Sequence, residues 1–155
     1  MQHFIGTYEC KADAKGRIML PAALKKQLSS YLNKSFVIKR AVFNNCLELY
    51  PLDQWEGLME KVNKLNRFKK KNNDFIRRFT AGVKLLEFDA TGRLLIPKDL
   101  SNHAKISKEV VVSSVVNILE IWDKGLYEKA IDEATTDFAA LAEEVMGDQN
   151  EDNIS

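Results

Sequence analysis

The feature that most constrains this chain of 155 residues is an internal repeat. The segment Asp13-Ala-Lys-Gly-Arg-Ile-Met-Leu-Pro21 returns at one fixed offset as Asp89-Ala-Thr-Gly-Arg-Leu-Leu-Ile-Pro97. Further along, Leu47-Glu-Leu-Tyr50 returns as Leu119-Glu-Ile-Trp122 at a shorter offset, which places a small insertion or deletion in a loop between strands. Chance rarely produces two ordered blocks of this kind. We therefore predict a duplication, with two copies of one small folding unit.

Each copy is predicted to be β-rich, because short segments of β-branched, aromatic and aliphatic residues are typical of strands. The predicted strands and hairpins are residues 4–10, 17–20, 36–40 and 46–50, and residues 81–88, 93–96, 109–115 and 118–122. Apolar residues at helical spacing predict helices between and after the copies. The organisation that follows is a first unit at 4–56, a helical linker at 57–79, a second unit at 80–128, a C-terminal helix at 129–146 and a disordered acidic tail at 147–155. The predicted fold class is mixed α+β.

The repeated motif has a structural interpretation. Its aspartate is predicted to cap a tight turn, or to pair with the arginine that follows and orient it. Its glycine fits a turn position with positive φ, and its proline fits the first position of a helix, where no N–H is lost. The residues predicted to be structural are Asp13, Gly16, Pro21, Asp89, Gly92 and Pro97.

The formal net charge of +1 hides an uneven distribution. Residues 61–78 hold eight lysines and arginines against one acid, Asp74, whereas no lysine or arginine follows Ala130. A basic middle can approach a polyanion, and an acidic tail is repelled by one. A run of charges is more often a solvated helix face than a binding site, and we expect that role for residues 61–78.

Several classes of protein are not expected. No apolar run approaches the roughly 20 residues of a membrane helix, and the first ten residues lack the regions of a secretory signal. Cys10 and Cys46 are expected to be reduced and buried, as in a cytosolic protein. His3 and His103 are isolated, so we predict no metal site. We also expect no cofactor, no membrane partner and no small-molecule substrate.

The motifs and the segments around them resemble a known family. One Asp-x-x-x-Arg motif is weak, but two in tandem, each with its glycine and proline, are specific. The matching segments are Phe4-x-Gly6-x-Tyr8, residues 13–22, Leu47-x-Leu49-Tyr50-Pro51-x-x-x-Trp55, Phe79-x-Ala81-Gly82, residues 89–97 and Ile121-Trp122-Asp123. Over about residues 4 to 130, the chain resembles the MraZ family.

The resemblance implies two tandem SpoVT-AbrB-like swapped-hairpin units that form a pseudo-dimeric β-barrel with flanking helices. It also implies a homo-oligomeric ring that binds double-stranded DNA. The DNA sites implied are short direct repeats upstream of the bacterial cell-division and cell-wall gene cluster. The function that follows is a cytoplasmic, nucleoid-associated, sequence-specific regulator of transcription.

Cations at the motifs are candidate DNA contacts, because neutralising phosphates supplies much of the affinity of such proteins. The candidates are Lys11, Lys15, Arg17 and Arg93. On the motif alone, the two arginines fit barrel salt bridges as well as DNA contacts, and the resemblance favours DNA. Thr91 stands where the first repeat has Lys15, so the second repeat offers one cation fewer, and an equal contribution from both is not expected.

The sequence also bears on three other functions. An aspartic-protease-like enzyme would need Asp13 and Asp89 to share a proton, but the arginine after each favours ionised carboxylates, so an enzyme is not expected. An antitoxin of the AbrB fold would hold a toxin with its acidic C-terminal arm, although such antitoxins usually carry one unit per chain. An oligomeric scaffold would form rings without DNA.

Overall fold

The computed structural model describes residues 3–134 and 137–147. The chain divides into two compact units, Met1–Lys124 and Gly125–Ser155, and each is described by itself. The strands are β1 (Thr7–Lys11), β2 (Arg17–Met19), β3 (Phe36–Arg40), β4 (Leu47–Pro51), β5 (Lys84–Leu86), β6 (Arg93–Leu95), β7 (Glu109–Val115) and β8 (Ile118–Asp123). The helices are α1 (Ala22–Gln27), α2 (Leu52–Asn63), α3 (Lys70–Phe79), α4 (Lys98–His103), α5 (Lys124–Ala134) and α6 (Phe138–Gly147).

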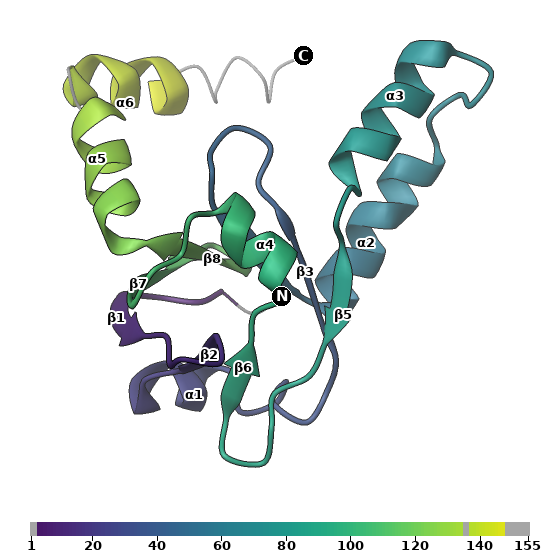
Figure 1. The fold of residues 1–155 in the computed structure, drawn as a ribbon. Coiled ribbons are helices and arrows are strands. Elements are labelled where there is room, and N and C mark those ends of the chain that lie inside the picture. The colour runs from purple at the N-terminus through teal and green to yellow at the C-terminus, as the bar shows by residue number, and fades with distance from the viewer. Residues whose placement is uncertain (1–2, 135–136, 148–155) are drawn as a thin grey trace. The chain divides into compact units, whose positions relative to one another are not determined.

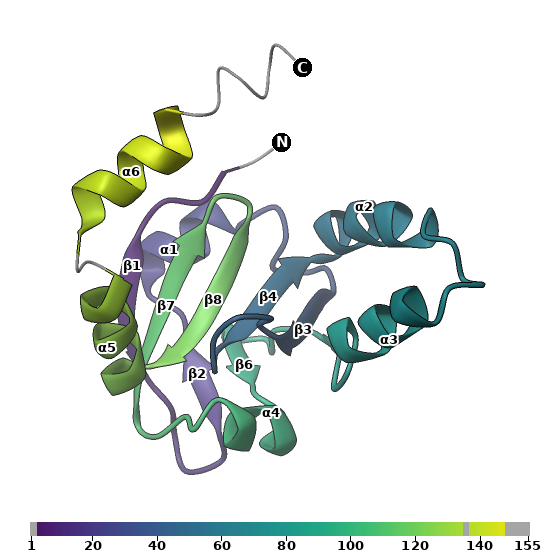
Figure 2. The ribbon, with the colours of Figure 1, turned by 90° about the horizontal axis from the view of Figure 1, so that it is seen from above.

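The two repeats exchange strands in the larger unit (Figure 2). The six-stranded sheet has the order β1-β7-β8-β4-β3-β5, so β1 of the first repeat pairs with β7 of the second. In return, β5 of the second repeat pairs with β3 of the first. The remaining short strands, β2 and β6, form a separate two-stranded sheet. The pairs are antiparallel, and the fold is mixed α+β, as the sequence predicts.

The sheets do not close into the barrel that the resemblance implies. Among the described residues, β1 and β5 are the two edges of the six-stranded sheet and do not pair with each other. The two sheets meet through an isolated bridge between Ala12 and Ile18. Because β2, β5 and β6 are only three residues long, they supply few of the ladder hydrogen bonds that a closed barrel needs.

One face of the six-stranded sheet forms the main core with β2, β6, α1 and α4. Ile18 and Leu94, at the centres of β2 and β6, are completely buried there. The helices α1 and α4 each contribute a leucine at the same position of the repeat, and both of these residues, Leu24 and Leu100, are also completely buried. Full burial of a leucine contributes about 1.5–3 kcal/mol. The repeats are therefore stabilised by one shared core rather than by two separate ones.

On the opposite face of the sheet α2 packs against β3 and β4, and α3 lies beside α2 (Figure 1). Pro51 directly precedes α2, so this helix begins before the predicted helical linker at 57–79. Trp55 of α2 contacts Tyr50 of β4 edge to face, with ring centroids 5.3 Å apart. Its indole also stacks on Phe79 of α3, at 6.3 Å between centroids. These aromatic contacts fix α2 and α3 to the sheet.

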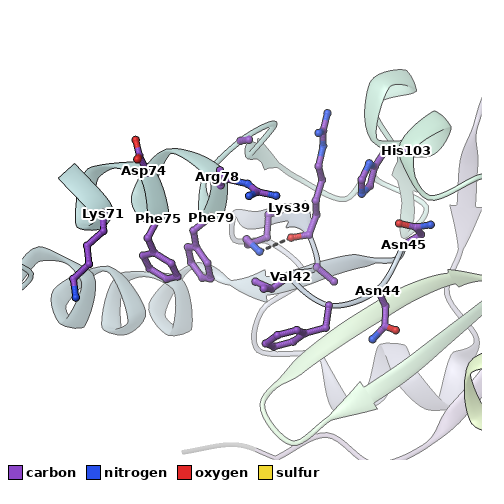
Figure 3. A pocket seen from close by; sticks show the side chains of 14 residues that line it. Lys39, Val42, Asn44, Asn45, Lys71, Asp74, Phe75, Arg78, Phe79 and His103 are labelled. Atoms are coloured by element: carbon purple, nitrogen blue, oxygen red, sulfur yellow. Dashed lines mark hydrogen bonds between the residues drawn. The ribbon is translucent and has the colours of Figure 1, made fainter. Parts of the chain in front are cut away.

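A buried cation lies beneath α3. The side chain of Lys39 is only 1% exposed, and its ammonium donates hydrogen bonds to the backbone oxygen of Arg40 (Figure 3) and, at 3.2 Å, to the carboxylate of Glu48. The ammonium also lies 4.3 Å from the centre of the Phe79 ring. Lys39 lines a hollow of about 630 Å³ that the β3–β4 loop and α3 enclose. No motif in the sequence marks this residue.

The smaller unit contains α6 and nearly all of α5. The sequence predicts one helix over residues 129–146, but α5 ends at Ala134 and α6 begins at Phe138. Asp137 explains the second start, because its carboxylate accepts a hydrogen bond from the N–H of Ala140 at 3.2 Å, as an N-terminal cap does. The predicted disordered tail lies outside the described residues, apart from Gly147. None of the helices in the described ranges is long and apolar enough to cross a membrane.

Candidate nucleic-acid interface

The first turn, residues 13–17, is organised around one carboxylate. Asp13 Oδ1 accepts hydrogen bonds from the backbone N–H groups of Lys15 and Arg17, both at 2.9 Å. Asp13 Oδ2 accepts a third hydrogen bond, from Arg17 Nε at 2.8 Å. Gly16 has a φ of +84°, which L side chains rarely adopt. The aspartate thus closes the turn and also fixes the direction of its arginine.

The second turn, residues 89–93, repeats this geometry. Asp89 Oδ1 accepts hydrogen bonds from the backbone N–H groups of Thr91 and Arg93 at 3.0 and 2.9 Å. Asp89 Oδ2 accepts one from Arg93 Nε at 2.9 Å, and Gly92 has a φ of +82°. The hydroxyl of Thr91 adds a donor at 2.8 Å to Asp89 Oδ1. The two copies of the motif therefore build the same structure.

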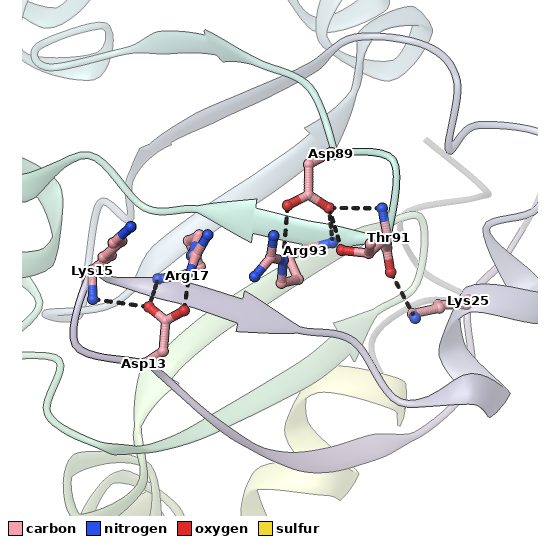
Figure 4. A network of polar contacts seen from close by, with 7 residues as sticks. All are labelled: Asp13, Lys15, Arg17, Lys25, Asp89, Thr91 and Arg93. Atoms are coloured by element: carbon pink, nitrogen blue, oxygen red, sulfur yellow. Dashed lines mark hydrogen bonds and ion pairs between the residues drawn. The ribbon is translucent and has the colours of Figure 1, made fainter.

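The pairing of β2 with β6 brings the two turns onto one surface (Figure 4). In the register of this pair, Arg17 lies opposite Leu95 and Met19 lies opposite Arg93. The central residue of each strand points into the core, so strand alternation places both arginines on the outer face. The side chains of Arg17 and Arg93 are 28% and 34% exposed. Each guanidinium therefore has terminal N–H groups within reach of a ligand on that face.

Both aspartates are held in the ionised form. Hydrogen bonding to the backbone N–H of Arg17 lowers the pKa of Asp13, and the equivalent bond from Arg93 lowers the pKa of Asp89. A catalytic pair that shares one proton needs one carboxyl with a raised pKa, and these two are both lowered. The described part of the chain also contains no cluster of His, Cys, Asp or Glu side chains that could hold a metal ion. The arrangement therefore does not suit acid–base catalysis by this pair of aspartates.

Comparison with known proteins identifies the family. The family model described as MraZ protein, antitoxin-like, matches residues 3–78 and again residues 79–149. The chain belongs to the MraZ family. A protein from Flavobacterium psychrophilum named Transcriptional regulator MraZ is 65% identical over 152 residues, which cover 98% of this chain and 97% of that protein. Proteins of the same name from Christiangramia forsetii and Pediococcus pentosaceus are 64% and 38% identical, over 100% and 92% of this chain and 100% and 96% of their own lengths.

Membership of the MraZ family confirms the resemblance on which the sequence predictions rest. The chain carries two tandem MraZ domains, as the duplication predicts. Because the relatives are named as regulators of transcription, the expectation that the chain is not an enzyme also holds.

The structure brings most of the predicted DNA contacts together. Lys15 lies exposed at the tip of the first turn, on the same surface as Arg17 and Arg93 (Figure 4). Lys11 is also exposed, but it ends β1 opposite Glu109 of β7, so an acidic residue is its neighbour. The three residues at the turns therefore form the centre of the candidate interface, and Lys11 lies beside it.

Three further lysines lie at the turns although no repeated motif marks them. Lys25 of α1 donates a hydrogen bond from Nζ to the backbone oxygen of Thr91, at 3.3 Å. Lys98 and Lys108 line a hollow of about 720 Å³ beside the first turn. Each of these lysines belongs to one repeat and lies at the turn of the other repeat. Their positions depend on the exchange of strands, which no local sequence pattern specifies.

The basic segment at residues 61–78 forms the end of α2, the following loop and most of α3. Its eight lysines and arginines are exposed, as a solvated face requires. Lys70 and Arg77 pair with Asp74 at 2.7 and 3.2 Å, and exposed pairs of this kind add little stability. Lys71 and Arg78 line the hollow above Lys39 (Figure 3).

Proposed function

We propose that this chain regulates transcription by binding specific double-stranded DNA with its first and second turns. The observation that carries the proposal is the pair of arginines on the outer face of β2 and β6, each fixed through Nε by its own aspartate. A guanidinium held in place loses little conformational freedom when it binds. Its terminal N–H groups suit bidentate contact with phosphate or with guanine. The names of the MraZ relatives support the regulation of transcription.

The other motif residues have distinct roles in this mechanism. Lys15 contacts the phosphate backbone from the tip of the first turn, and Lys11 contributes at its edge. The aspartates, glycines and prolines of the motif position these cations and do not contact DNA. Neutralisation of phosphates releases counterions, so the affinity depends steeply on salt concentration.

The finer features follow the family resemblance. The chain forms a homo-oligomeric ring, in the cytoplasm at the nucleoid, and binds short direct repeats upstream of the cell-division and cell-wall gene cluster. Turns repeated at fixed spacing around a ring make several weak contacts at once, and linking such contacts multiplies affinity. The exchanged strands correspond to the swapped hairpins that the resemblance implies. No cofactor, membrane or small-molecule substrate takes part.

The test is binding of the purified chain to DNA from its own upstream region, measured by fluorescence anisotropy over a series of salt concentrations. We expect preference for this DNA over a scrambled duplex, and a large loss of affinity in Lys15→Ala/Arg17→Ala. The charge-matched control is Lys64→Ala/Arg67→Ala, which removes two exposed cations from the basic segment and should bind like the wild type. Equal affinity for both duplexes would contradict sequence-specific regulation.

Two alternatives have their own signatures. Absence of binding to either duplex at low salt, together with an oligomer in size-exclusion chromatography that DNA does not change, would favour a scaffold. The antitoxin-like description of the family supports the second alternative. A stable complex with a toxin protein through the acidic C-terminal helices would favour it.

A further inference from the structure

We infer that the second turn is a composite phosphate-binding site, in which Lys25 of the first repeat supplies the cation that Thr91 of the second repeat lacks. This inference rests on the proposed function, because the phosphate belongs to the bound DNA. It assigns a binding role to a residue that lies outside the repeated motif.

Lys25 is held against the second turn by two contacts. Its ammonium donates a hydrogen bond to the backbone oxygen of Thr91 at 3.3 Å, and a dashed line marks this bond in Figure 4. Its aliphatic chain lies over Gly92, since a Cβ at that position would come within 2.9 Å of Lys25 Cε. An ammonium has three donors, and the bond to Thr91 is the single hydrogen bond from it within the described residues. Two donors are therefore available to a phosphate.

At the first turn, the lysine lies in the turn itself and not on the helix that approaches it. Lys25 is the fourth residue after Pro21, and the fourth residue after Pro97 is Ser101. Ser101 lines the hollow beside the first turn, so α4 approaches the first turn as α1 approaches the second. At these two positions the first turn has a lysine in the turn and a serine on the helix. At the second turn the helix carries the lysine, and the turn carries a threonine.

The consequence is that each turn has a lysine beside the arginine that its own aspartate orients, although the two turns differ in sequence. The first turn also has Lys98 and Lys108, which line the hollow next to it. The sequence alone indicates one cation fewer in the second repeat, and the exchange of repeats restores that cation. A duplex that contacts both turns therefore meets a lysine and an oriented arginine at each of them.

The inference is tested with Lys25→Ala, with Lys26→Ala as the control and with the double variant Lys25→Ala/Thr91→Lys. Lys26 is the adjacent residue of the same helix, carries the same charge and is exposed. The affinity for the upstream DNA is measured by fluorescence anisotropy at several salt concentrations. The quantity compared between variants is the slope of log affinity against log salt concentration. Urea unfolding of each variant shows whether its fold is intact.

We expect Lys25→Ala to weaken binding. It should also reduce the slope by about 0.9 for each copy of the protein's second turn (residues 89–93) that contacts the duplex. Lys26→Ala should leave the slope unchanged, and the double variant should regain the wild-type slope, because the lysine returns on the turn itself. If Lys25→Ala binds like Lys26→Ala while Lys15→Ala/Arg17→Ala does not bind, the inference is wrong and the proposed function stands. If the wild type binds no DNA, both are wrong.

Discussion

Two glutamates at equivalent positions of the repeats should respond to the same substitution in opposite ways. Glu48 of β4 and Glu120 of β8 lie directly opposite each other in the sheet. Like charges in this arrangement destabilise a sheet. Both side chains are partly buried, so solvent screens their repulsion less than it would at the surface.

The partners of the two glutamates differ. Glu48 binds the ammonium of Lys39 at 3.2 Å and accepts a hydrogen bond from the hydroxyl of Tyr50 at 3.1 Å. Glu120 accepts a hydrogen bond from Trp122 Nε1 at 2.9 Å. Burial raises the pKa of Glu120, the bond from Trp122 opposes this shift, and the charge of Glu48 adds to it.

The substitution to glutamine removes a charge and keeps an oxygen that can accept hydrogen bonds. In Glu120→Gln it relieves the repulsion, so we expect stabilisation by about 0.2–1 kcal/mol, the size of a cross-strand charge interaction. In Glu48→Gln it leaves the buried ammonium of Lys39 without a counter-charge. Removing one partner of a buried ion pair costs about 3–5 kcal/mol, and we expect about 3 kcal/mol because the glutamine oxygen can still accept a hydrogen bond.

The gain in Glu120→Gln depends on pH. The pKa of Glu120 is raised in the folded protein, so the wild type loses stability as the pH rises from the ordinary value of 4.5 through the folded pKa. Glutamine does not titrate, and it avoids this loss. The gain is therefore present at pH 7 and largely disappears at pH 4, where the carboxyl is mostly protonated in both states.

The measurement is urea unfolding followed by circular dichroism at pH 7 and at pH 4. With a slope of about 2 kcal/mol per molar urea, Glu48→Gln lowers the midpoint by about 1.5 M and Glu120→Gln raises it by about 0.1–0.5 M. Shifts in the same direction for both variants would refute the assignment of Lys39 to Glu48. A gain in Glu120→Gln that persists at pH 4 would show that charge repulsion is not its cause.

Three other predictions follow from the repeat. Leu24→Ala and Leu100→Ala should each cost about 2–5 kcal/mol in urea unfolding, because both leucines are completely buried in the core. A loss at only one of them would contradict the equal burial of the two leucines. Gly16→Ala should destabilise the chain by about 1–2 kcal/mol and weaken DNA binding, since alanine is strained at a φ of +84°; unchanged binding would contradict the role of the turn. A fragment of residues 1–79 should not form a folded monomer, because it lacks β7, the partner of β1. Mixing it with a fragment of residues 80–147 should restore folding, as measured by circular dichroism and size-exclusion chromatography.

The local structure could be predicted from the sequence because its causes are local. An aspartate before a turn glycine accepts the nearby N–H groups, whatever the rest of the chain does. Short segments rich in β-branched, aromatic and aliphatic residues likewise marked the hairpins β3–β4 and β7–β8. The duplication was evident because both copies keep the residues that these local structures require.

The pairing of strands between the repeats could not be derived in this way. Alternation determines which face of a strand is buried, but β1 and β5 present equivalent edges, and either could pair with the hairpin of its own repeat. Lys25 could not be placed at Thr91 for the same reason, since the contact spans the two repeats. The buried pair of Lys39 and Glu48 was missed because a charged residue in a strand usually indicates a solvent-facing position.

Fusion of two copies in one chain explains how their polar residues could diverge. In a symmetric dimer of single units every substitution acts twice, so both turns and both helices would carry the same residues. In the fused chain one copy can change alone, as Thr91 differs from Lys15 and Ser101 differs from Lys25. In both pairs the lysine lies in the first repeat, and the exchange of repeats brings Lys25 to the second turn while Lys15 stays at the first. The presence of a lysine beside each arginine, rather than the residue at each position of the repeat, is therefore the property on which binding to DNA would depend.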